Sequence, residues 1–294
     1  MSATGPQPGL RAVAVNLAGV IEQPEFGDSP YRIDQDGRSY VPVGDGGVVL
    51  GVRLGDSAFG RDGDHVAPGA CLAHADAAAR HALTSYACIG NEVVVRTGAA
   101  AGARGVVIGK RGEAGRVIVS LAPADLARLR PADQVVVTGV GQGWRPEGYP
   151  DEVAVLNVAP AALPLLPVAT GPDGVTAQVR AVVPSKLAGN GIGRPAVGWC
   201  LDLQLSPADG DVHLGDLIAV ADLDARWNMG YRRGWLTVGV VVHGDSPLPG
   251  HGPGITPILT GPGTALRAQA DPAGHAGLTD AAVQSIAARE PARP

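Results

Sequence analysis

Two histidines near the end of the sequence, one before a glycine- and proline-rich loop and one inside it, have the clearest potential for chemistry. His243 ends a nearly continuous apolar run over residues 236–242, and His251 follows inside the loop. Imidazole serves as a general acid, a general base or a metal ligand near neutral pH. Glycine lets a backbone approach a ligand closely, so we expect Gly252 and Gly254 to leave room for a bound substrate. The pattern predicts a catalytic pocket that contains both histidines.

Two further segments place polar side chains at the ends of expected strands. His65 precedes a Pro-Gly turn, where it is either a catalytic residue or a turn residue bonded to backbone. Asn91 and Glu92 open an apolar strand, so Glu92 could serve as a general base while Asn91 orients a substrate. The alternative is a capped turn with a surface carboxylate. We expect His65, Glu92, His243 and His251 to converge in one cleft.

Three residues in glycine-rich loops are candidates for substrate binding. Lys110 is one of only two lysines in a chain that otherwise uses arginine, and its compact ammonium either holds an anionic group or is solvated on a hairpin. Gln142 lies between two glycines after a strand; because no helix follows, we reject a dinucleotide-binding motif and expect no nucleotide cofactor. Asn190 lies in a loop whose backbone amides could form an anion-binding nest.

Acidic residues bracket the apolar run over residues 217–221. Asp216 precedes this run and is either a turn former or an oxygen ligand beside His243 and His251. A divalent metal is therefore the one cofactor that the sequence suggests, with His243, His251 and Asp216 as its ligands. No tight histidine motif such as HExxH accompanies them, so this hypothesis depends on residue types alone.

Composition narrows the class of protein. The chain of 294 residues is long enough for one large domain or two smaller ones. Its net charge of −5 and scattered basic residues give no electrostatic footprint for nucleic acid. No apolar run approaches the roughly 18 residues of a membrane-spanning helix, so we expect a cytoplasmic protein without a membrane partner. The three cysteines have no metal-finger spacing and are typical of small buried hydrophobes.

Short apolar runs bounded by glycine, proline or aspartate dominate the sequence and indicate strands. Three segments look helical: residues 73–83, 124–129 and 280–289, the last capped by Thr279. We therefore expect a mainly β protein of the α+β class, with barrel- or sandwich-like sheets and a few short helices.

The spacing of glycines also suggests how the chain is divided. Residues 98–143 have the glycine corners and short valine-rich strands of a small, strongly bent barrel. This unit would belong to an N-terminal β-rich region over residues 9–160. A C-terminal β-rich region over residues 175–262 would carry the glycine-histidine loop. Residues 1–8 and 290–294 have the composition of flexible tails.

Several motifs together resemble the prokaryotic family called domain of unknown function 4438. The likeness covers residues 10 to 260, and its motifs are His65-Val-Ala-Pro-Gly69, Tyr86-Ala-Cys-Ile-Gly-Asn-Glu92, Gly105-Val-Val-Ile-Gly-Lys110, Gly141-Gln-Gly143, Leu187-Ala-Gly-Asn-Gly-Ile-Gly193, Gly215-Asp216, Gly239-Val-Val-Val-His243 and Gly250-His-Gly-Pro-Gly254. The chain departs from the family pattern at Asn190, where a small hydroxyl residue is expected, and over residues 198–202, whose contribution to a site the sequence leaves open. The resemblance implies a β-rich fold and carries no activity. A more distant likeness to acetamidase/formamidase-type amidohydrolases is an analogy of fold alone.

Two hypotheses for function follow. In the first, the protein is an enzyme that acts on a small polar metabolite, a hydrolase or a lyase/isomerase at a carboxamide or carboxylate. His243 and His251 would then be acid/base residues or metal ligands, and Lys110, Asn91 and Gln142 would orient the substrate. In the second, it is a non-catalytic small-molecule-binding or oligomeric structural protein. Either way, we expect a small-molecule ligand and a homo-oligomer.

Overall fold

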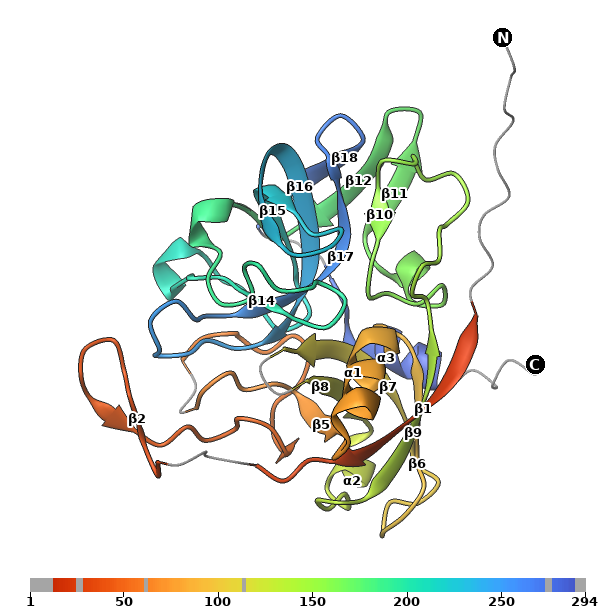
Figure 1. Cartoon of the computed structure of the whole chain (residues 1–294), viewed down its shortest axis with the longest axis vertical. Helices are drawn as coiled ribbons and strands as arrows, with labels where there is room; N and C mark the ends of the chain where they lie inside the picture. The colour runs from red at the N-terminus through yellow and green to blue at the C-terminus, as the bar shows by residue number, and fades with distance from the viewer. Residues whose placement is uncertain (1–12, 25–28, 61–62, 113–114, 273–276, 289–294) are drawn as a thin grey trace.

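The computed structural model describes residues 13–24, 29–60, 63–112, 115–272 and 277–288. A β-barrel forms the lower half of Figure 1, and a second sheet forms the upper half. The segment that carries β2 (Arg32–Ile33) and β3 (Ser39–Tyr40) reaches away from the barrel as a two-stranded ribbon.

The first sheet closes on itself because its first strand, residues 14–21, also pairs with the strand over residues 69–73. The antiparallel contact of Val20 with Ala73 and of Ile21 with Leu72 completes a six-stranded barrel. Around the barrel, the strands are β1 (Ala14–Ile21), β9 (Gln134–Val140), β6 (Glu92–Val95), β7 (Arg104–Arg111), β8 (Arg116–Leu121) and β5 (Gly69–Ala73), with the short β4 (Val48–Val49) beside β5.

Apolar side chains on the two faces of the barrel strands belong to two separate hydrophobic clusters. On β8, Val117 and Val119 pack in one hydrophobic cluster with residues of every barrel strand, whereas Ile118 between them packs in a second cluster. Successive side chains of a strand point to opposite faces, so the first cluster fills the barrel and the second lies outside it. The outer face of β7 and β8 is apolar because the second sheet covers it.

The second sheet is built around a long hairpin whose strands are buried on both faces. On β16, Val240 and Val242 pack toward the barrel in the shared cluster, whereas Val241 packs with Ile255 in a third cluster on the far side. Burial on both faces explains why residues 236–242 form a nearly continuous apolar run rather than an alternating one. The sheet contains β10 (Ala154–Val155), β17 (Gly254–Pro262), β16 (Gly230–His243), β15 (Leu217–Asp224) and β13 (Ala181–Pro184), with β14 (Leu201–Asp202) also paired to β17.

The remaining elements are small. A three-stranded sheet contains β11 (Val168–Gly171), β12 (Gly174–Val179) and β18 (Leu266–Ala270). The helices are α1 (Ala77–Tyr86), α2 (Pro123–Leu126) and α3 (Asp280–Ala287), with short 3-10 turns at Leu163–Leu165, Ser185–Leu187 and Pro207–Asp209. Asp76 caps α1 and Thr279 caps α3, each by accepting a hydrogen bond from a backbone N–H in the first turn.

The expected mainly β architecture is confirmed, with differences of detail. The barrel extends well beyond residues 98–143, because β1, β5 and β6 close it. Residues 69–73 form a strand, and α1 therefore begins at Ala77 rather than at residue 73. Residues 254–262, which follow the glycine- and proline-rich loop, form β17, whose pairing with β16 tolerates Pro257 at a register shift. The tails expected at residues 1–8 and 290–294, and Arg289, lie outside the described residues.

Candidate metal centre

Two histidine side chains from distant parts of the sequence meet at one oxygen of Asp202. Its Oδ2 lies 3.2 Å from Nε2 of His65 and 3.0 Å from Nδ1 of His251, and the two histidine nitrogens are 3.0 Å apart. The rings of His65 and His251 stand nearly perpendicular, with centroids 5.0 Å apart. These three ligand-type atoms therefore form a tight triangle.

The fold brings the three residues together through the edges of the second sheet. Asp202 lies on β14, which pairs with the start of β17, and His251 lies in the loop just before β17. The backbone around Asp202 is fixed further because its N–H donates to the carbonyl of Asn190 and its carbonyl accepts from Gly189. His65 belongs to the loop before β5, and its N–H donates to the carbonyl of Asp245, just beyond β16.

His65 is held in an unusual conformation with its second nitrogen engaged. Its φ of 52° lies in the left-handed region, which is uncommon for a residue other than glycine and recurs at functional sites. Its Nδ1 lies 2.6 Å from Oδ1 of Asp64. The other oxygen of Asp64 accepts from Arg32 at 2.7 Å and from the Tyr40 hydroxyl at 2.8 Å. A buried carboxylate thus orients the ring and directs Nε2 toward Asp202.

The other oxygen of Asp202 faces a second set of groups. Oδ1 lies 3.3 Å from Nε2 of His243 and 3.9 Å from Sγ of Cys200, and that sulfur is 3.5 Å from the same histidine nitrogen. The second nitrogen of His243 lies 3.0 Å from the carbonyl of Gly244. His243, Cys200 and Asp202 are all buried. Asp202 therefore stands between two groups of potential ligands.

The charges in this cluster depend on one another. Burial alone would raise the pKa of Asp202, but hydrogen bonds from His243, His251 and His65 hold that pKa well below its usual range. Burial opposes protonation of the histidines, yet hydrogen bonds to Asp202 and Asp64 raise the pKa of His65, and those to Asp202 and Cys200 raise the pKa of His243 to about 9. The cluster is therefore built to compensate the negative charge of Asp202 with cations.

The separations within the triangle match those of ligands around a transition-metal ion. Two ligand atoms that each lie about 2.1 Å from an ion, at right angles, are about 3.0 Å apart. The three separations among His65, His251 and Asp202 are 3.0, 3.0 and 3.2 Å. Two histidines and one carboxylate on one face of an ion leave the opposite face open.

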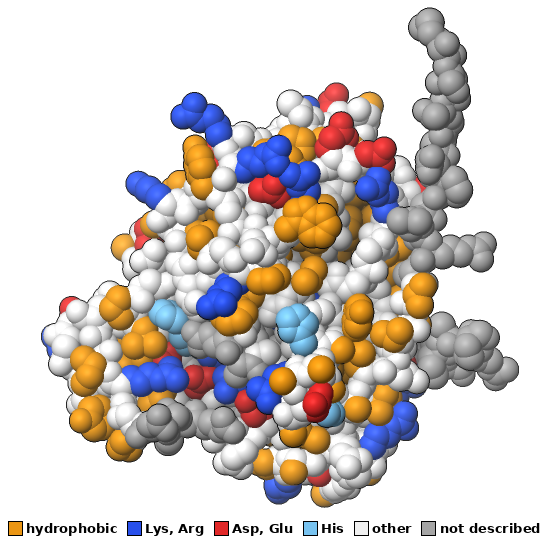
Figure 2. Space-filling view, in the orientation of Figure 1, with side chains coloured by type: hydrophobic (Ala, Val, Ile, Leu, Met, Phe, Trp, Pro, Cys, Tyr) orange, Lys and Arg blue, Asp and Glu red, His pale blue; other side chains and the backbone are white. Residues whose placement is uncertain are grey.

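Access to the triangle is through His251, whose side chain is 19% exposed while those of His65 and Asp202 are buried. The face drawn in Figure 2 shows histidine side chains above a band where basic and acidic side chains alternate. Ion pairs among the described residues include Arg32 with both Asp45 and Asp64. Charged groups therefore extend from the support of His65 toward the barrel.

Two expected members of the site lie elsewhere. Glu92 does not join the histidines: it is on β6 of the barrel, and its carboxylate pairs with Arg104 at 2.7 Å. Asp216 is held by Arg180 at 2.9 Å and accepts from the N–H of His213, as a turn former before β15. The acidic residue beside His243 and His251 is Asp202. The expected convergence is thus met by His65, His243 and His251, without Glu92.

Lys110 is neither solvated nor placed to meet a ligand. The residue is fully buried, and its ammonium donates to the carbonyls of Ser85 and Val197 and to Oδ1 of Asn157 at 2.8 Å. Gln142 joins this network by donating to Ser85 and Asn157. Burial lowers the pKa of Lys110 to about 8. Lys110 and Gln142 therefore fix the barrel to the second sheet instead of orienting a substrate.

The other expected substrate contacts also have structural partners. Asn91 is buried, donates to the carbonyl of Val140 and accepts from the N–H of Cys88, which is the capped-turn alternative. Asn190 supports the backbone of Asp202, as described above. Gly252 and Gly254 make close contacts: a Cβ at Gly252 would lie 1.9 Å from the carbonyl oxygen of Leu203, and one at Gly254 would lie 1.9 Å from Nε2 of His243. These glycines leave room for the protein's own atoms.

Cys200, Asp202 and Asp64 are the cluster members that sequence reasoning missed as site residues. Asp202 and Cys200 lie in the segment that only loosely matches the family pattern, on or beside a strand of two residues. Asp64 directly precedes His65, and this adjacency of a carboxylate and an imidazole was the one local signal available.

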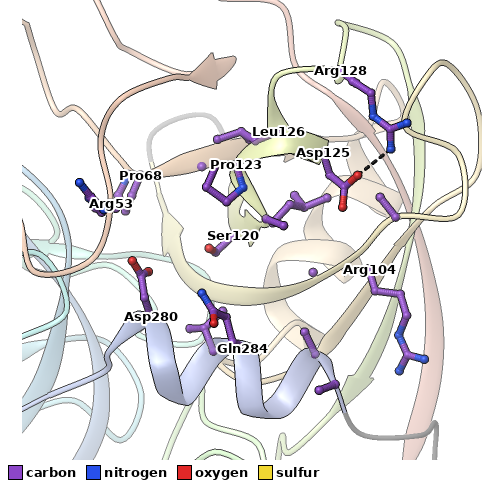
Figure 3. A pocket seen from close by; sticks show the side chains of 18 of the residues that line it. Arg53, Pro68, Arg104, Ser120, Pro123, Asp125, Leu126, Arg128, Asp280 and Gln284 are labelled. Carbon is purple, nitrogen blue, oxygen red and sulfur yellow. Dashed lines mark hydrogen bonds and ion pairs between the residues drawn. The ribbon is translucent and has the colours of Figure 1, made fainter.

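A large cavity among the described residues lies away from these clusters. It has a volume of about 1030 Å³ and is formed by α2, α3 and the loops beside β7 and β5. Figure 3 shows Asp280 and Gln284 on α3 at the bottom of the view, Pro123 and the Asp125–Arg128 ion pair above them, and Arg53 beside Pro68 at the left. No member of the histidine cluster lines this cavity.

Comparisons with known proteins agree with the fold and the motifs. The chain belongs to the family described as domain of unknown function (DUF4438): its N-terminal model matches residues 31–164 and its C-terminal model matches residues 165–278. The chain is 32% identical to the protein in the crystal structure of TM1086, with a TM-score of 0.86, over 92% of this chain and 98% of that one. No curated protein matches the chain. In the part of the chain that the structure describes, the helices are too short or too polar to span a membrane.

The burial of Lys110 predicts that even the conservative Lys110→Arg substitution is costly. The larger guanidinium must displace packed atoms and cannot lose its charge, so we expect the free energy of unfolding to fall by about 2 kcal/mol. Lys186, the only other lysine, is exposed, and Lys186→Arg should change stability by less than about 0.5 kcal/mol. Denaturant unfolding of both variants makes the comparison, and equal stabilities would show that the contacts of Lys110 are dispensable.

The close contacts of the two loop glycines predict a graded response to valine. Gly252→Val and Gly254→Val should reduce soluble yield and thermal stability far more than Gly261→Val, where the nearest atom to a Cβ is a valine methyl at 3.2 Å. The cause is steric, since none of these three glycines has a positive φ. Melting temperatures of the three variants test this, and comparable tolerance at all three positions would contradict it.

Proposed function

We propose that this protein is a metal-dependent enzyme that acts on a small polar metabolite, at a carboxamide or carboxylate group, by hydrolysis or by a lyase or isomerase step. A divalent ion would be held by Nε2 of His65, Nδ1 of His251 and Oδ2 of Asp202. The observation that carries the proposal is the triangle of these atoms, with separations of 3.0 to 3.2 Å.

The groups behind the ligands support a metal rather than an ordinary ion pair. A histidine that ligates a metal characteristically gives its second nitrogen to a carboxylate or a carbonyl, which fixes the ring and the tautomer. The carboxylate of Asp64 lies beside the second nitrogen of His65 as an ion-pair partner at 2.6 Å, and Arg32 and Tyr40 in turn hold Asp64. A histidine needed only to neutralise Asp202 would not require a second buried carboxylate on its other nitrogen.

The ligand set indicates which chemistry the ion would supply. Imidazole and carboxylate ligands suit zinc, iron, manganese and related divalent ions, and such an ion polarises a carbonyl oxygen or activates water. The chain itself would fix the ion with three buried or half-buried ligands and leave coordination positions on the side of His251. Because only that ligand is partly exposed, the substrate should be small.

A non-catalytic binding function is the second candidate, and one observation favours it. The cavity of about 1030 Å³ beside α2 and α3 is large enough for a metabolite and lies apart from the histidine cluster. In that case the metal centre would be structural and closed. The two candidates therefore differ in whether the ion accepts an external ligand.

The first part of the test measures which residues hold the ion. We expect purified protein to retain a divalent metal after gel filtration, and His65→Ala and His251→Ala to lower the metal content by about one ion per chain. His213→Ala is the matched control, because His213 also contacts carboxylates but lies outside the cluster. Elemental analysis of the three variants and the wild type measures the metal content per chain. An unchanged metal content in His65→Ala would contradict the proposal.

The second part measures whether the ion is open to a substrate. We expect acetohydroxamate, a chelating mimic of a carboxamide, to change the visible spectrum of the cobalt-loaded protein, and small primary carboxamides to release ammonia with the wild type but not with Asp202→Asn. If adding acetohydroxamate leaves the visible spectrum of the cobalt-loaded protein unchanged, the ion is closed and structural, and the binding function is favoured instead.

A further inference from the structure

The side of Asp202 that faces away from the triangle carries its own set of ligand atoms. Cys200 offers a thiol, His243 offers Nε2, and Asp202 offers Oδ1. All three residues are buried, with exposed fractions of 3%, 0% and 1%. None of these atoms belongs to the set that the proposed function assigns to the first ion.

The separations in this second set fit a tetrahedral ion with a thiolate ligand. For an ion about 2.3 Å from sulfur and about 2.1 Å from nitrogen or oxygen, tetrahedral angles place the ligand atoms about 3.4 to 3.6 Å apart. The structure has 3.5 Å between Cys200 and His243, 3.3 Å between His243 and Asp202, and 3.9 Å between Cys200 and Asp202. Only the last separation is slightly long.

The surroundings of His243 prepare it as a ligand. Because the carbonyl of Gly244 beside Nδ1 can only accept, the neutral ring keeps its proton on Nδ1, and Nε2 is the nitrogen that would bind an ion in place of its own proton. Gly254 packs against this ring so closely that a Cβ would lie 1.9 Å from Nε2. The absence of a side chain at Gly254 is therefore what permits Nε2 to face Asp202 and Cys200.

We propose that Cys200, Asp202 and His243 bind a second divalent ion of the zinc class, so that the carboxylate of Asp202 bridges two metal ions. The thiolate selects zinc or a comparably soft ion, whereas the triangle of His65, His251 and Asp202 takes the ion that meets substrate. Carboxylate-bridged pairs of ions are common in enzymes that hydrolyse small molecules. The inference deepens the proposed function and depends on it only for the first ion.

Cobalt substitution tests the second ion separately from the first. We expect wild-type protein to bind two cobalt ions per chain and to show the intense near-ultraviolet absorption of a thiolate bound to cobalt. Cys200→Ser should bind one ion and lose that absorption. Cys71→Ala and Cys88→Ala are matched controls, because both thiols are buried and lie outside the cluster, and both variants should behave as wild type.

A second variant, which keeps Cys200, tests the same proposal if Cys200→Ser fails to fold. The double variant Cys71→Ala/Cys88→Ala retains Cys200 as its only cysteine, so thiolate absorption in that protein must come from this residue. Binding of one cobalt ion without thiolate absorption would overturn the second ion and leave the proposed function standing. Binding of one ion with thiolate absorption would overturn the bridged pair, and binding of none would overturn both proposals.

Discussion

A single buried carboxylate, that of Asp202, imposes the main constraint on this structure. A charge removed from water is expensive unless charged or hydrogen-bonding partners surround it. Here the partners are His65, His243 and His251, which come from a barrel loop, the end of β16 and the loop that follows it. The fold must therefore bring three distant segments, around residues 65, 202 and 243–251, to within hydrogen-bonding distance. Oδ2 contacts His65 and the partly exposed His251, whereas Oδ1 faces the buried His243 and Cys200. One carboxylate thus separates the partly exposed side of the centre from its buried side.

The packing of the barrel against the second sheet makes this convergence possible. The outer faces of β7 and β8 and the inner face of β16 share one hydrophobic cluster, and the approach is so close that a Cβ at Gly109 would lie 2.3 Å from Val242. Lys110, next in sequence, adds a polar connection by donating across the contact to Asn157 and Val197. Val242 is followed directly by His243. The residues that join the two halves thus also fix where the histidine stands, which links the stability of the contact to the geometry of the centre.

Local patterns were sufficient for some features and insufficient for others. The β-rich architecture and the convergence of His65, His243 and His251 could be predicted, because apolar periodicity and histidines beside glycine or proline are local signals. The place of Asp202 could not, since it lies on a strand of two residues that acquires its position only through pairing with β17. The misassignment of Lys110 has the same origin: a lysine at a glycine corner looks exposed until the second sheet covers it. When a segment distant in the sequence buries a residue, the pattern of residues around that position does not reveal the burial.

The claim that Asp202 organises a metal centre is tested most directly by anomalous X-ray diffraction from crystals grown with zinc and measured on both sides of the zinc absorption edge. The account predicts an anomalous peak within about 2 Å of Oδ2 of Asp202, Nε2 of His65 and Nδ1 of His251, because those are the distances at which such ligands bind. A density map with no anomalous peak among these atoms, and with His65 and His251 still hydrogen-bonded to Asp202, would contradict it.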